Sequence, residues 1–415
     1  MKQGWEIKKL LDVVDFQRGL TYSKNDEVDF SENMVLRSNN VDLKTNKLDF
    51  TEIRYINPKI VIPENKKVTK GSLIICTANG SKSHLGKVAL IDDDYNYAFG
   101  GFMGLIKPKA NLNSDFLFHL LTSEAYKKFI GALSDGANIN NLKFGDLGEF
   151  EIPLPPLPEQ QRIVAILDEA FAAIAKAKAN AEQNLKNAKE LFESYLQGVF
   201  DPSTRSGQGN KGEGWEVKAM GAVCEVMNGG TPDTTVSKFW NGEHLWITPK
   251  DMGKMKGIYV DNTLRKITDD GLKNSSAKIL PPNSIILSSR APIGHLAINT
   301  KPISTNQGCK GLVPKKGVDT LFLYYFLYKS VDLLNSLGTG TTFKELSGSK
   351  LTTVIIPIPS LKAQQIIVKK LDALSAETKK LEAIYNQKIN DLEELKKSVL
   401  QKAFSGELNN KTLTL

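Results

Sequence analysis

Two loops of this 415-residue sequence carry residue types that could bind phosphate or cut nucleic acid, but neither has the required spacing. Five residues separate Gly80 from Gly86-Lys87, whereas the phosphate loop of nucleotide hydrolases has four, and Val88 stands where that loop needs Ser or Thr for magnesium. Pro232-Asp233 could begin a nuclease motif, but no Asp/Glu-x-Lys follows it at a useful distance. The sequence therefore predicts neither nucleotide hydrolysis nor metal-dependent cleavage.

The other groups that could act as nucleophiles, bases or metal ligands are scattered along the chain. A methyltransferase acting on a base amino group needs Asp or Asn before Pro-Pro and an aromatic residue after it, and neither Pro155-Pro156 nor Pro281-Pro282 has these neighbours. The cysteines form no C-x-x-C pair, and no histidine stands in a recognisable catalytic elbow. We therefore expect no catalysis, no metal and no cofactor in this chain. The residues concerned are Cys76, Cys224, Cys309, His84, His119, His244 and His295.

What remains is a set of polar loops with the residue types that contact nucleic acid. Arg can bind guanine, and Asn or Gln adenine, through paired hydrogen bonds, while Lys, Ser, Thr and backbone amides hold phosphates. The same residues also build ordinary turns, and that alternative stays open for each loop. The parallel placement of TANGSKSHLGKVA and LSSRAPIGHLAI in the two halves favours DNA contact. The candidate DNA-binding residues are Arg18, Tyr22, Lys24, Arg37, Asn39, Asn79, Ser81 and Lys82, and then Thr231, Thr248, Lys250, Ser289, Arg290, Asn306, Gln307 and Thr341.

Composition and charge indicate a multidomain globular protein that suits a polyanionic partner. No apolar run reaches the roughly 18 residues that a membrane helix needs, and the N-terminus lacks the features of a signal peptide, so we expect a cytoplasmic location. The net charge is +8. Residues 1–153 have 20 basic and 20 acidic residues, whereas residues 203–357 have 19 against 12, a net charge of +7. If the first half binds nucleic acid, it must use a local patch or charge from a partner.

A proline-to-helix junction occurs twice in the sequence. Ile152–Asp168 (IPLPPLPEQQRIVAILD) aligns with Ile356–Asp372 (IPIPSLKAQQIIVKKLD) at an offset of 356 − 152 = 204, with 10 of 17 positions identical. The start of each half matches as well, since Gly4-Trp5-Glu6 corresponds to Gly214-Trp215-Glu216. So long a period indicates two copies of a globular domain, each followed by the same helix, and not a solenoid.

A long helix is predicted after each junction. From Pro158 to Phe200 only Gly198 disfavours a helix, and Pro202 ends the run. Apolar or small residues recur at alternating steps of four and three, and a shift of 204 gives the second helix the same heptad phase. Alanines on the first helix complement larger residues on the second, which favours an antiparallel coiled coil, although each helix could pack only on its own domain. The expected seam positions are Ile163, Leu167, Ala170, Ile174, Ala177, Ala181, Ala188, Leu191 and Tyr195, and then Ile367, Leu371, Leu374, Thr378, Leu381, Tyr385, Leu392, Leu395 and Val399.

These features predict an α+β fold with two similar α/β domains, separated by a long antiparallel two-helix coiled coil and related by an internal pseudo-twofold repeat. The glycine-rich stretch 201–214 is expected to be a flexible linker, and the chain is expected to fray after Gly406. The predicted boundaries are a first globular domain at 1–153, a first long helix at 154–202, a second globular domain at 203–357, a second long helix at 358–408 and a frayed tail at 409–415.

The pattern resembles the specificity (S) subunit of type I restriction-modification systems over essentially the whole chain. The features that carry the resemblance are the Gly-Trp-Glu opening of each half, the stretches EIPLPPLPEQQRIVAILD and IIPIPSLKAQQIIVKKLD, and the helix ends LQGVF and LQKAF. It implies a non-catalytic DNA reader in which each globular domain is a target recognition domain for one half of a bipartite, asymmetric sequence. The helices would set the spacing and dock two methyltransferase (M) subunits, with Gln160, Gln161, Gln364 and Gln365 at the two junctions.

The implied partners are double-stranded DNA, two M subunits and restriction (R) subunits, with no membrane and no small-molecule substrate. AdoMet, ATP and Mg would be bound by those partner subunits and not by this chain. Two other classes stay open. A coiled-coil scaffold without DNA readout would show no salt-dependent binding to duplex DNA, and a fused single-chain restriction enzyme would itself bind AdoMet or magnesium.

Overall fold

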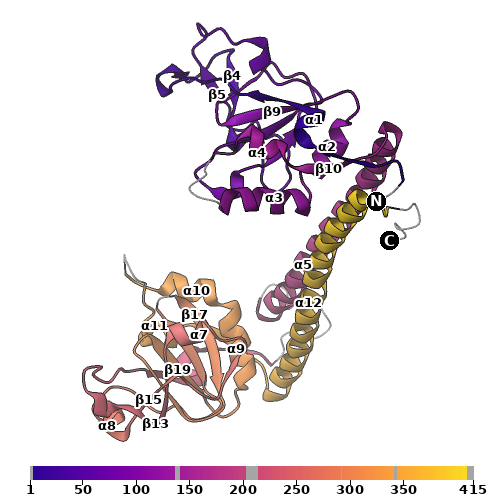
Figure 1. The fold of residues 1–415 in the computed structure, drawn as a ribbon. Coiled ribbons are helices and arrows are strands. Elements are labelled where there is room, and N and C mark those ends of the chain that lie inside the picture. The colour runs from indigo at the N-terminus through magenta and orange to yellow at the C-terminus, as the bar shows by residue number, and fades with distance from the viewer. Residues whose placement is uncertain (1–2, 136–140, 202–213, 291, 341–343, 409–415) are drawn as a thin grey trace. The chain divides into compact units, whose positions relative to one another are not determined.

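The computed structural model describes residues 3–135, 141–201, 214–290, 292–340 and 344–408. The chain divides into two compact units, each with both helices and sheets (Figure 1). The first unit comprises Met1–Gln183 and Asn386–Leu415, and the second comprises Asn184–Tyr385. Residues 202–213 of the expected linker (201–214) and the tail at 409–415 lie outside the described residues. Within the described part of the chain, no helix has the length and apolar character needed to cross a membrane.

The first unit contains two four-stranded sheets with apolar interiors. The larger sheet has strands of 3–6 residues and the smaller one has strands of 2–3 residues. Alternate side chains of a strand point to opposite faces, so Leu73 and Ile75 join one hydrophobic cluster while Ile74 joins another. Ile74 shares its cluster with Leu36 and Phe99 of the smaller sheet. The strand orders are β2 (Val14–Arg18), β9 (Met103–Pro108), β6 (Leu73–Cys76) and β7 (Val88–Leu90), and β3 (Glu27–Val28), β5 (Arg54–Ile56), β4 (Met34–Leu36) and β8 (Ala98–Phe99).

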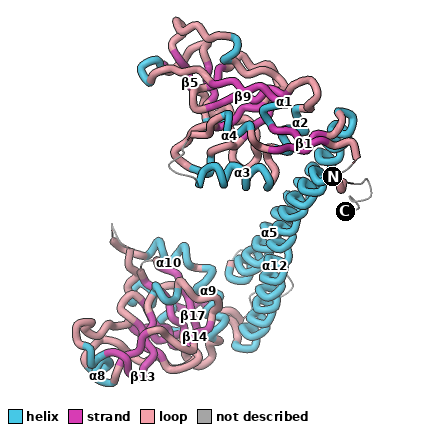
Figure 2. The backbone as a smooth tube through the Cα atoms, in the orientation of Figure 1, coloured by secondary structure: helices cyan, strands magenta, loops and turns pink. Residues whose placement is uncertain are grey.

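Short helices pack against the larger sheet of the first unit (Figure 2). Phe116 and Leu117 lie in the same cluster as Leu73 and Ile75. Asn113 caps the helix that carries these residues, because its Oδ1 accepts a hydrogen bond from Phe116 N at 2.9 Å. The helices are α1 (Leu10–Val13), α2 (Ser114–Leu120), α3 (Glu124–Asp135) and α4 (Phe144–Gly148), with 3-10 turns η1 (Lys24–Asp26), η2 (Ser38–Asn40), η3 (Glu64–Lys66) and η4 (Lys82–His84).

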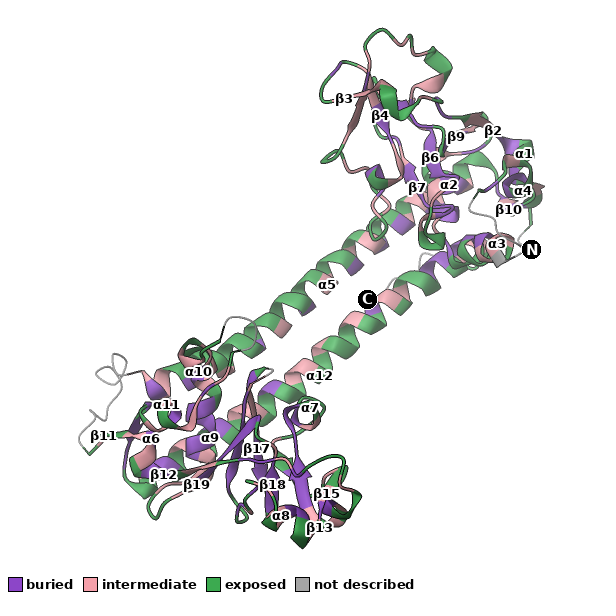
Figure 3. Cartoon of the chain, turned by 90° about the vertical axis from the view of Figure 1, so that its left-hand side faces the viewer, coloured by how far each residue is buried: buried purple, intermediate pink, exposed green. Residues whose placement is uncertain are grey.

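The second unit contains a five-stranded and a three-stranded sheet. The central strand of the larger sheet, Ile285–Ser289, is fully buried, and Figure 3 shows buried residues along the inner strands. The strand orders are β12 (Cys224–Asn228), β19 (Cys309–Pro314), β16 (Ile285–Ser289), β17 (Ile293–Asn299) and β14 (Tyr259–Val260), and β15 (Arg265–Ile267), β13 (Trp240–Ile247) and β18 (Ile303–Thr305). The helices are α6 (Met220–Val223), α7 (Pro249–Met252), α8 (Asp269–Lys273), α9 (Thr320–Lys329), α10 (Val331–Leu337) and α11 (Gly348–Thr352), with the 3-10 turn η6 (Ser237–Phe239).

Each unit also has a two-stranded antiparallel sheet that joins its first strand to the strand before a long helix. Glu6 lies opposite Leu154 in the first unit, and Glu216 lies opposite Ile358 in the second. The two pairs therefore have corresponding registers in the positions that the sequence repeat aligns. The strands are β1 (Glu6–Lys9) with β10 (Glu151–Leu154) and β11 (Glu216–Ala219) with β20 (Ile355–Ile358), followed by the long helices α5 (Leu157–Phe200) and α12 (Leu361–Ser405).

In the first unit the beginning of α5 packs against the end of α12. Lys396 Nζ lies 5.0 Å from the centre of the Phe171 ring, and Lys178 Nζ lies 2.5 Å from Glu393 Oε1. Residue numbers fall along α12 as they rise along α5, so these two segments are antiparallel. Their shared hydrophobic cluster includes Ile163, Leu167 and Ala170 from α5 and Val399, Leu400 and Ala403 from α12.

In the second unit the end of α5 lies beside the beginning of α12. Thr378 Oγ1 donates a hydrogen bond to Ala188 O at 3.4 Å. Leu196 and Phe200 share a hydrophobic cluster with Val368 and Leu371. The direction is again antiparallel, because the α5 residue with the lower number pairs with the α12 residue with the higher number.

Two expectations about the helices are wrong in detail. Leu191 was expected in the seam, but 57% of it is exposed. The ring of its neighbour Phe192 packs on Tyr325 and Tyr328 of α9. At this point the apolar face of α5 therefore contacts α9. Leu408 was expected to fray, but it is 2% exposed and belongs to the core of the first unit.

Candidate nucleic-acid interface

A cavity of about 790 Å³ opens on the first unit among four of the candidate DNA-binding residues. Tyr22, Lys24, Arg37 and Asn39 line it. Tyr22 lies in the turn after β2, Lys24 in η1 and Asn39 in η2, and Arg37 directly precedes η2. The β8–β9 loop forms another wall. That loop can approach the end of β2 because residue 19 is glycine, at which a Cβ would lie 2.0 Å from Gly100 O.

Two arginines and an exposed aromatic ring give this cavity its chemical character. Arg54 Nη1 pairs with Glu27 Oε2 at 3.0 Å. The Nε atoms of Arg37 and Arg54 are both buried without a hydrogen-bond partner among the described residues. Phe102 lines the same cavity and is 72% exposed. Guanidinium groups beside an aromatic ring can bind a base edge or a phosphate and stack on a base.

The sequence reasoning missed Arg54 and Phe102. Arg54 lies within a strand, where no glycine or turn residue marks it as part of a loop. Phe102 follows Gly100-Gly101, and an aromatic residue next to two glycines was the available signal for an exposed ring. Tyr22 is half-buried, and burial raises the pKa of its hydroxyl, so it stays a neutral hydrogen-bond donor at physiological pH.

The loop Asn79–Lys82 is tied to the same region through Asn79. Its Nδ2 donates to Ser38 Oγ at 2.9 Å, and its Oδ1 accepts from Ser81 N at 2.9 Å. Both polar ends of the Asn79 amide are therefore engaged within the protein, while Ser81 and Lys82 are exposed. Arg18 is also exposed, but its guanidinium lies 5.7 Å from the centre of the Phe144 ring and does not line the cavity.

Lys87, the lysine of the rejected phosphate loop, is a buried structural residue. Its Nζ donates to Val41 O at 2.7 Å and lies 2.8 Å from His84 Nδ1. Burial lowers the pKa of this amine. The hydrogen bonds tie Lys87 to neighbouring loops.

In the second unit several candidates gather around the β18–β19 turn. The Thr231 hydroxyl donates a hydrogen bond to Gln307 Oε1, and Asn306 Oδ1 accepts from Gly308 N at 3.0 Å. Arg290 Nη1 lies 3.5 Å from Glu345 Oε2. A Cβ on Gly308 would lie 3.3 Å from Arg290 Cγ, so this arginine packs directly on the turn. Gln307 and Lys250 are exposed.

The remaining candidates of the second unit are less accessible. Thr248 is 6% exposed and caps α7, with its hydroxyl donating to Asp251 Oδ2 at 2.6 Å. Ser289 is fully buried and its hydroxyl has no hydrogen-bond partner among the described residues. Neither side chain reaches the surface of this structure. Thr341 lies outside the described residues.

All three cysteines are buried, and burial raises the pKa of Cys224 and of Cys309 to about 12. Burial also raises the pKa of Cys76. Among the residues that the structure describes, no group of three or more His, Cys, Asp or Glu side chains could hold a metal ion.

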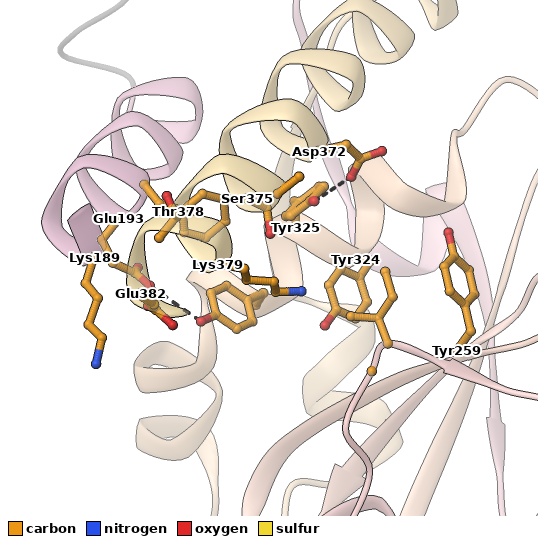
Figure 4. A pocket seen from close by; sticks show the side chains of 15 residues that line it. Lys189, Glu193, Tyr259, Tyr324, Tyr325, Asp372, Ser375, Thr378, Lys379 and Glu382 are labelled. Atoms are coloured by element: carbon orange, nitrogen blue, oxygen red, sulfur yellow. Dashed lines mark hydrogen bonds between the residues drawn. The ribbon is translucent and has the colours of Figure 1, made fainter. Parts of the chain in front are cut away.

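A second cavity, of about 660 Å³, lies in the second unit between α5, α9, α12 and β14 (Figure 4). Tyr325 Oη donates to Asp372 Oδ1 at 2.5 Å, and burial together with this hydrogen bond raises the pKa of Tyr325. Burial raises the pKa of Tyr324, which also faces the cavity, to about 12. These tyrosines therefore hold α9 against α12 as neutral hydroxyls and aromatic surface.

The first unit has a related contact between its own short and long helices. Nε2 of His119, in α2, lies 3.2 Å from Asp168 Oδ1. Asp168 aligns with Asp372 of the second unit at the repeat offset of 204. The His119 ring packs edge-on against Phe171, over which Lys396 lies. Burial lowers the pKa of His119, although Asp168 opposes this effect.

The first junction glutamine, Gln160, is fully buried and joins its globular part to α5. Its Nε2 donates to Pro155 O at 2.8 Å and to Asn111 O at 2.9 Å, and its Oε1 accepts from Asn113 N at 2.8 Å. Because Asn113 also caps α2, one side chain connects the proline turn, the loop before α2 and the long helix.

The second junction glutamine, Gln364, makes the same set of contacts in its own unit. Its Nε2 donates to Pro359 O at 2.9 Å and Gly317 O at 3.0 Å, and its Oε1 accepts from Asp319 N at 2.8 Å. Asp319 caps α9 in turn. The neighbouring glutamines, Gln161 and Gln365, are exposed.

The apolar residues predicted for the helix seam are mostly covered. Ile163, Leu167, Ile174 and Leu371 are at most 5% exposed. Ile367 and Leu381 are partly exposed. The alanines Ala170, Ala181 and Ala188 are buried as well, which agrees with close approach of the helices in each unit.

Comparison with known proteins identifies the family. The family model described as "Type I restriction modification DNA specificity domain" matches residues 2–186 and 212–393. The specificity subunit of the type I restriction enzyme EcoKI from Escherichia coli is 24% identical over 98% of this chain and 90% of its own length. The MjaIX specificity subunit of Methanocaldococcus jannaschii is 43% identical over a shorter stretch, 37% of this chain and 36% of that protein.

Solved structures show the same fold. The HsdS subunit from Thermoanaerobacter tengcongensis matches with a TM-score of 0.66 at 21% identity, covering 98% of both chains. A chain from a structure concerning complex assembly and conformational transition of the type I R-M system matches with a TM-score of 0.78 at 23% identity, over 98% of this chain and 99% of that one. The repeated junctions, the two mixed units and the match over both halves of the chain place this protein in the family of type I restriction-modification specificity subunits.

Proposed function

We propose that this chain is the DNA-reading subunit of a type I restriction-modification enzyme, and that each unit reads one half of a bipartite, asymmetric target. The observation that carries the proposal is the first-unit cavity, where Arg37 and Arg54 lie with Phe102 in a half of the sequence that has no net charge. Lys24, Arg37 and Arg54 outnumber Glu27 and Glu52 in the lining, 3 − 2 = +1, so the cavity supports a local positive charge in a domain without net charge. Asn39 and Lys24 add an amide and an ammonium group for base and phosphate contacts.

The second unit would use its exposed turn residues for the other half-site. Gln307 and Lys250 are exposed, and Arg290 packs beside them on Gly308. The net charge of +7 over residues 203–357 supports binding to a polyanion. Since the two units present different residue types, two different half-sites follow, and the complete target is asymmetric.

The long helices would form an antiparallel coiled coil that sets the spacer between the half-sites and docks two M subunits. Support comes from the α5–α12 contacts within each unit and from the exposed junction glutamines Gln161 and Gln365. The buried glutamines beside them attach each globular part firmly to its helix, so the position of a helix determines the position of its domain.

The chemistry would belong to the partner subunits. M subunits would bind AdoMet, and R subunits would bind ATP and Mg, while this chain would neither methylate nor cut DNA. The absence of nucleotide, methyltransferase and nuclease motifs from the sequence supports this division of labour.

The proposal is tested on the complex with its M subunits. Sequencing the methylated bases of cells that carry the complex gives the target, and the affinity of the purified complex for that duplex is then measured at several salt concentrations. Substituting Arg37 and Arg54 together with Ala should weaken discrimination at the first half-site by about 10- to 100-fold. Lys59→Ala, at an exposed lysine outside the cavity, is the matched control. Binding that is absent, or that does not depend on salt, would support the scaffold alternative.

A further inference from the structure

Lys310 of β19 is a buried lysine without a partner. It is 6% exposed, and no hydrogen bond or ion pair joins its amine to any residue that the structure describes. The amine nitrogen is not among the fully buried unpaired atoms of the described residues, so it opens onto the cavity that Lys310 lines. Burial of the rest of the side chain lowers the pKa of this amine, an effect that the nearby Glu345 opposes. Such a group is expected where a ligand supplies the missing negative charge.

The amine lies in a polar cavity of about 810 Å³. Asn228 is the direct cross-strand partner of Lys310, so the two side chains lie on the same face of the sheet. Ser347 and Ser349, whose hydroxyls lie 3.0 Å apart, also line this cavity. An ammonium, an amide and two hydroxyls therefore line one hollow.

At the corresponding place in the described part of the first unit, an aromatic ring fills the space. Gly104 lies opposite Arg18 there, as Lys310 lies opposite Asn228, and the Phe144 ring covers Gly104 so closely that a Cβ would lie 2.6 Å from Phe144 Cζ. Phe144 also stacks on Phe16, with ring centres 4.9 Å apart.

The second unit replaces this apolar filling by small and polar residues. Gly348 aligns with Phe144 and Val226 with Phe16, so both rings are missing. Gly348 and Val226 leave the space that the two rings fill in the first unit. Lys310, in the place of Gly104, puts a cation into that space. A structural role does not account for the change, because the first unit folds with the apolar arrangement.

The charge of the cavity indicates which ligand suits it. Glu345 also lines the cavity, but its carboxylate lies 3.5 Å from Arg290 Nη1 and is offset by that arginine. Lys310 then remains as one uncompensated positive charge. A single cation with amide and hydroxyl donors matches one singly charged oxyanion.

We propose that this cavity binds a phosphate group, through an ion pair with Lys310 and hydrogen bonds from Asn228 and from the one hydroxyl of the Ser347–Ser349 pair whose hydrogen is not used within the pair. A phosphodiester of the DNA backbone carries the single negative charge that the site requires. For that ligand the inference rests on the proposed function, and it assigns the second unit an anchor that fixes its position on the duplex. Free inorganic phosphate has the same chemistry, and the experiment distinguishes the two ligands by measuring DNA binding and binding of inorganic phosphate separately.

The experiment compares Lys310→Met, which keeps the length of the side chain, with Lys316→Met at an exposed lysine. A triple variant, Val226→Phe with Lys310→Gly and Gly348→Phe, copies the first unit and removes the cavity with a packing that the chain already uses. Thermal unfolding of each variant is checked first. Salt-dependent affinity is then measured on the complex with M subunits and a 40-base-pair duplex of mixed sequence, and binding of inorganic phosphate to the full chain is followed by ³¹P NMR.

Loss of one phosphate contact should reduce the slope of log K against log salt by about 0.9 in Lys310→Met and in the triple variant, and leave Lys316→Met unchanged. Binding of inorganic phosphate that is abolished by Lys310→Met, with an unchanged DNA slope, would support the phosphate site but assign it to the free ion. Unchanged slopes together with no phosphate binding would overturn the inference. If the wild-type complex binds no DNA, the proposed function fails, and the ³¹P measurement alone then decides the site.

Discussion

The side-chain amide of Gln160 lies 2.8 Å from the carbonyl oxygen of Pro155, and this hydrogen bond connects the first turn of α5 to the proline turn before it. The buried side chain makes two further hydrogen bonds, from Nε2 to Asn111 O and from Asn113 N to Oε1. Both polar atoms of the Gln160 side chain therefore have hydrogen-bond partners. The conspicuous Gln-Gln pair of the sequence motif thus contains one residue that holds the fold and one, Gln161, that faces the exterior.

Gln160→Leu should destabilise the first unit by about 2–4 kcal/mol, because it leaves the buried Pro155 carbonyl and two part-buried backbone groups without partners. Gln161→Leu, at the adjacent exposed position, should change stability by no more than about 0.5 kcal/mol. Urea unfolding followed by circular dichroism measures both. Equal effects of the two substitutions would show that the hydrogen-bond network contributes little.

The stability of the first unit should depend on pH through His119. Burial holds the folded-state pKa of His119 below its ordinary value of about 6.5, so the unfolded chain binds the proton more readily. Stability is therefore full above about pH 6.5 and falls as the pH drops below it, by up to about 1.4 kcal/mol per pH unit from this residue.

His119→Tyr, which copies Tyr325 of the second unit, should reduce that loss between pH 7.5 and 5.5. Tyr325→Phe is the control, because burial and Asp372 raise the pKa of Tyr325 and keep it neutral throughout this range. Melting temperatures across the pH series provide the comparison. The assignment to His119 is wrong if His119→Tyr and the wild-type chain lose stability in parallel.

Much of the helical architecture could be predicted from the sequence, because it depends on local patterns. The absence of helix breakers predicted a helix from Pro158 to Phe200, and the structure has one at Leu157–Phe200. Leu191 was misplaced because the heptad pattern does not show that Phe192 packs on α9.

The candidate site was harder to predict, because it depends on contacts between residues far apart in the chain. Arg54 reaches the first-unit cavity from a strand, and no local signal marks that position. Ser289 has the residue type and the neighbours of a DNA-contacting loop, yet it belongs to a central buried strand. No local signal marks Lys310 either, because its cavity depends on Gly348, which stands where the first unit has the Phe144 ring.

The length of the helices should control the spacer of the target. Removing seven residues from each helix within the first unit, Ala177–Gln183 and Asn386–Leu392, keeps the apolar positions in phase and shortens the pair by about 10 Å. That is about three base pairs, and it turns one domain by about 100° around the duplex. We expect a shorter spacer or complete loss of binding, with loss favoured by the rotation. Methylome sequencing that finds the original spacer at normal efficiency would exclude the helices as the ruler.

The most direct test of the central claim, that each unit reads one half-site, is to exchange one recognition domain. Residues 10–145 are replaced by the corresponding segment of a family relative with a different target, and the methylome of cells carrying the hybrid and its M subunits is sequenced. The account predicts a target in which one half-site is new while the other half-site and the spacer are unchanged. A target altered in both halves, or altered in neither, would contradict it.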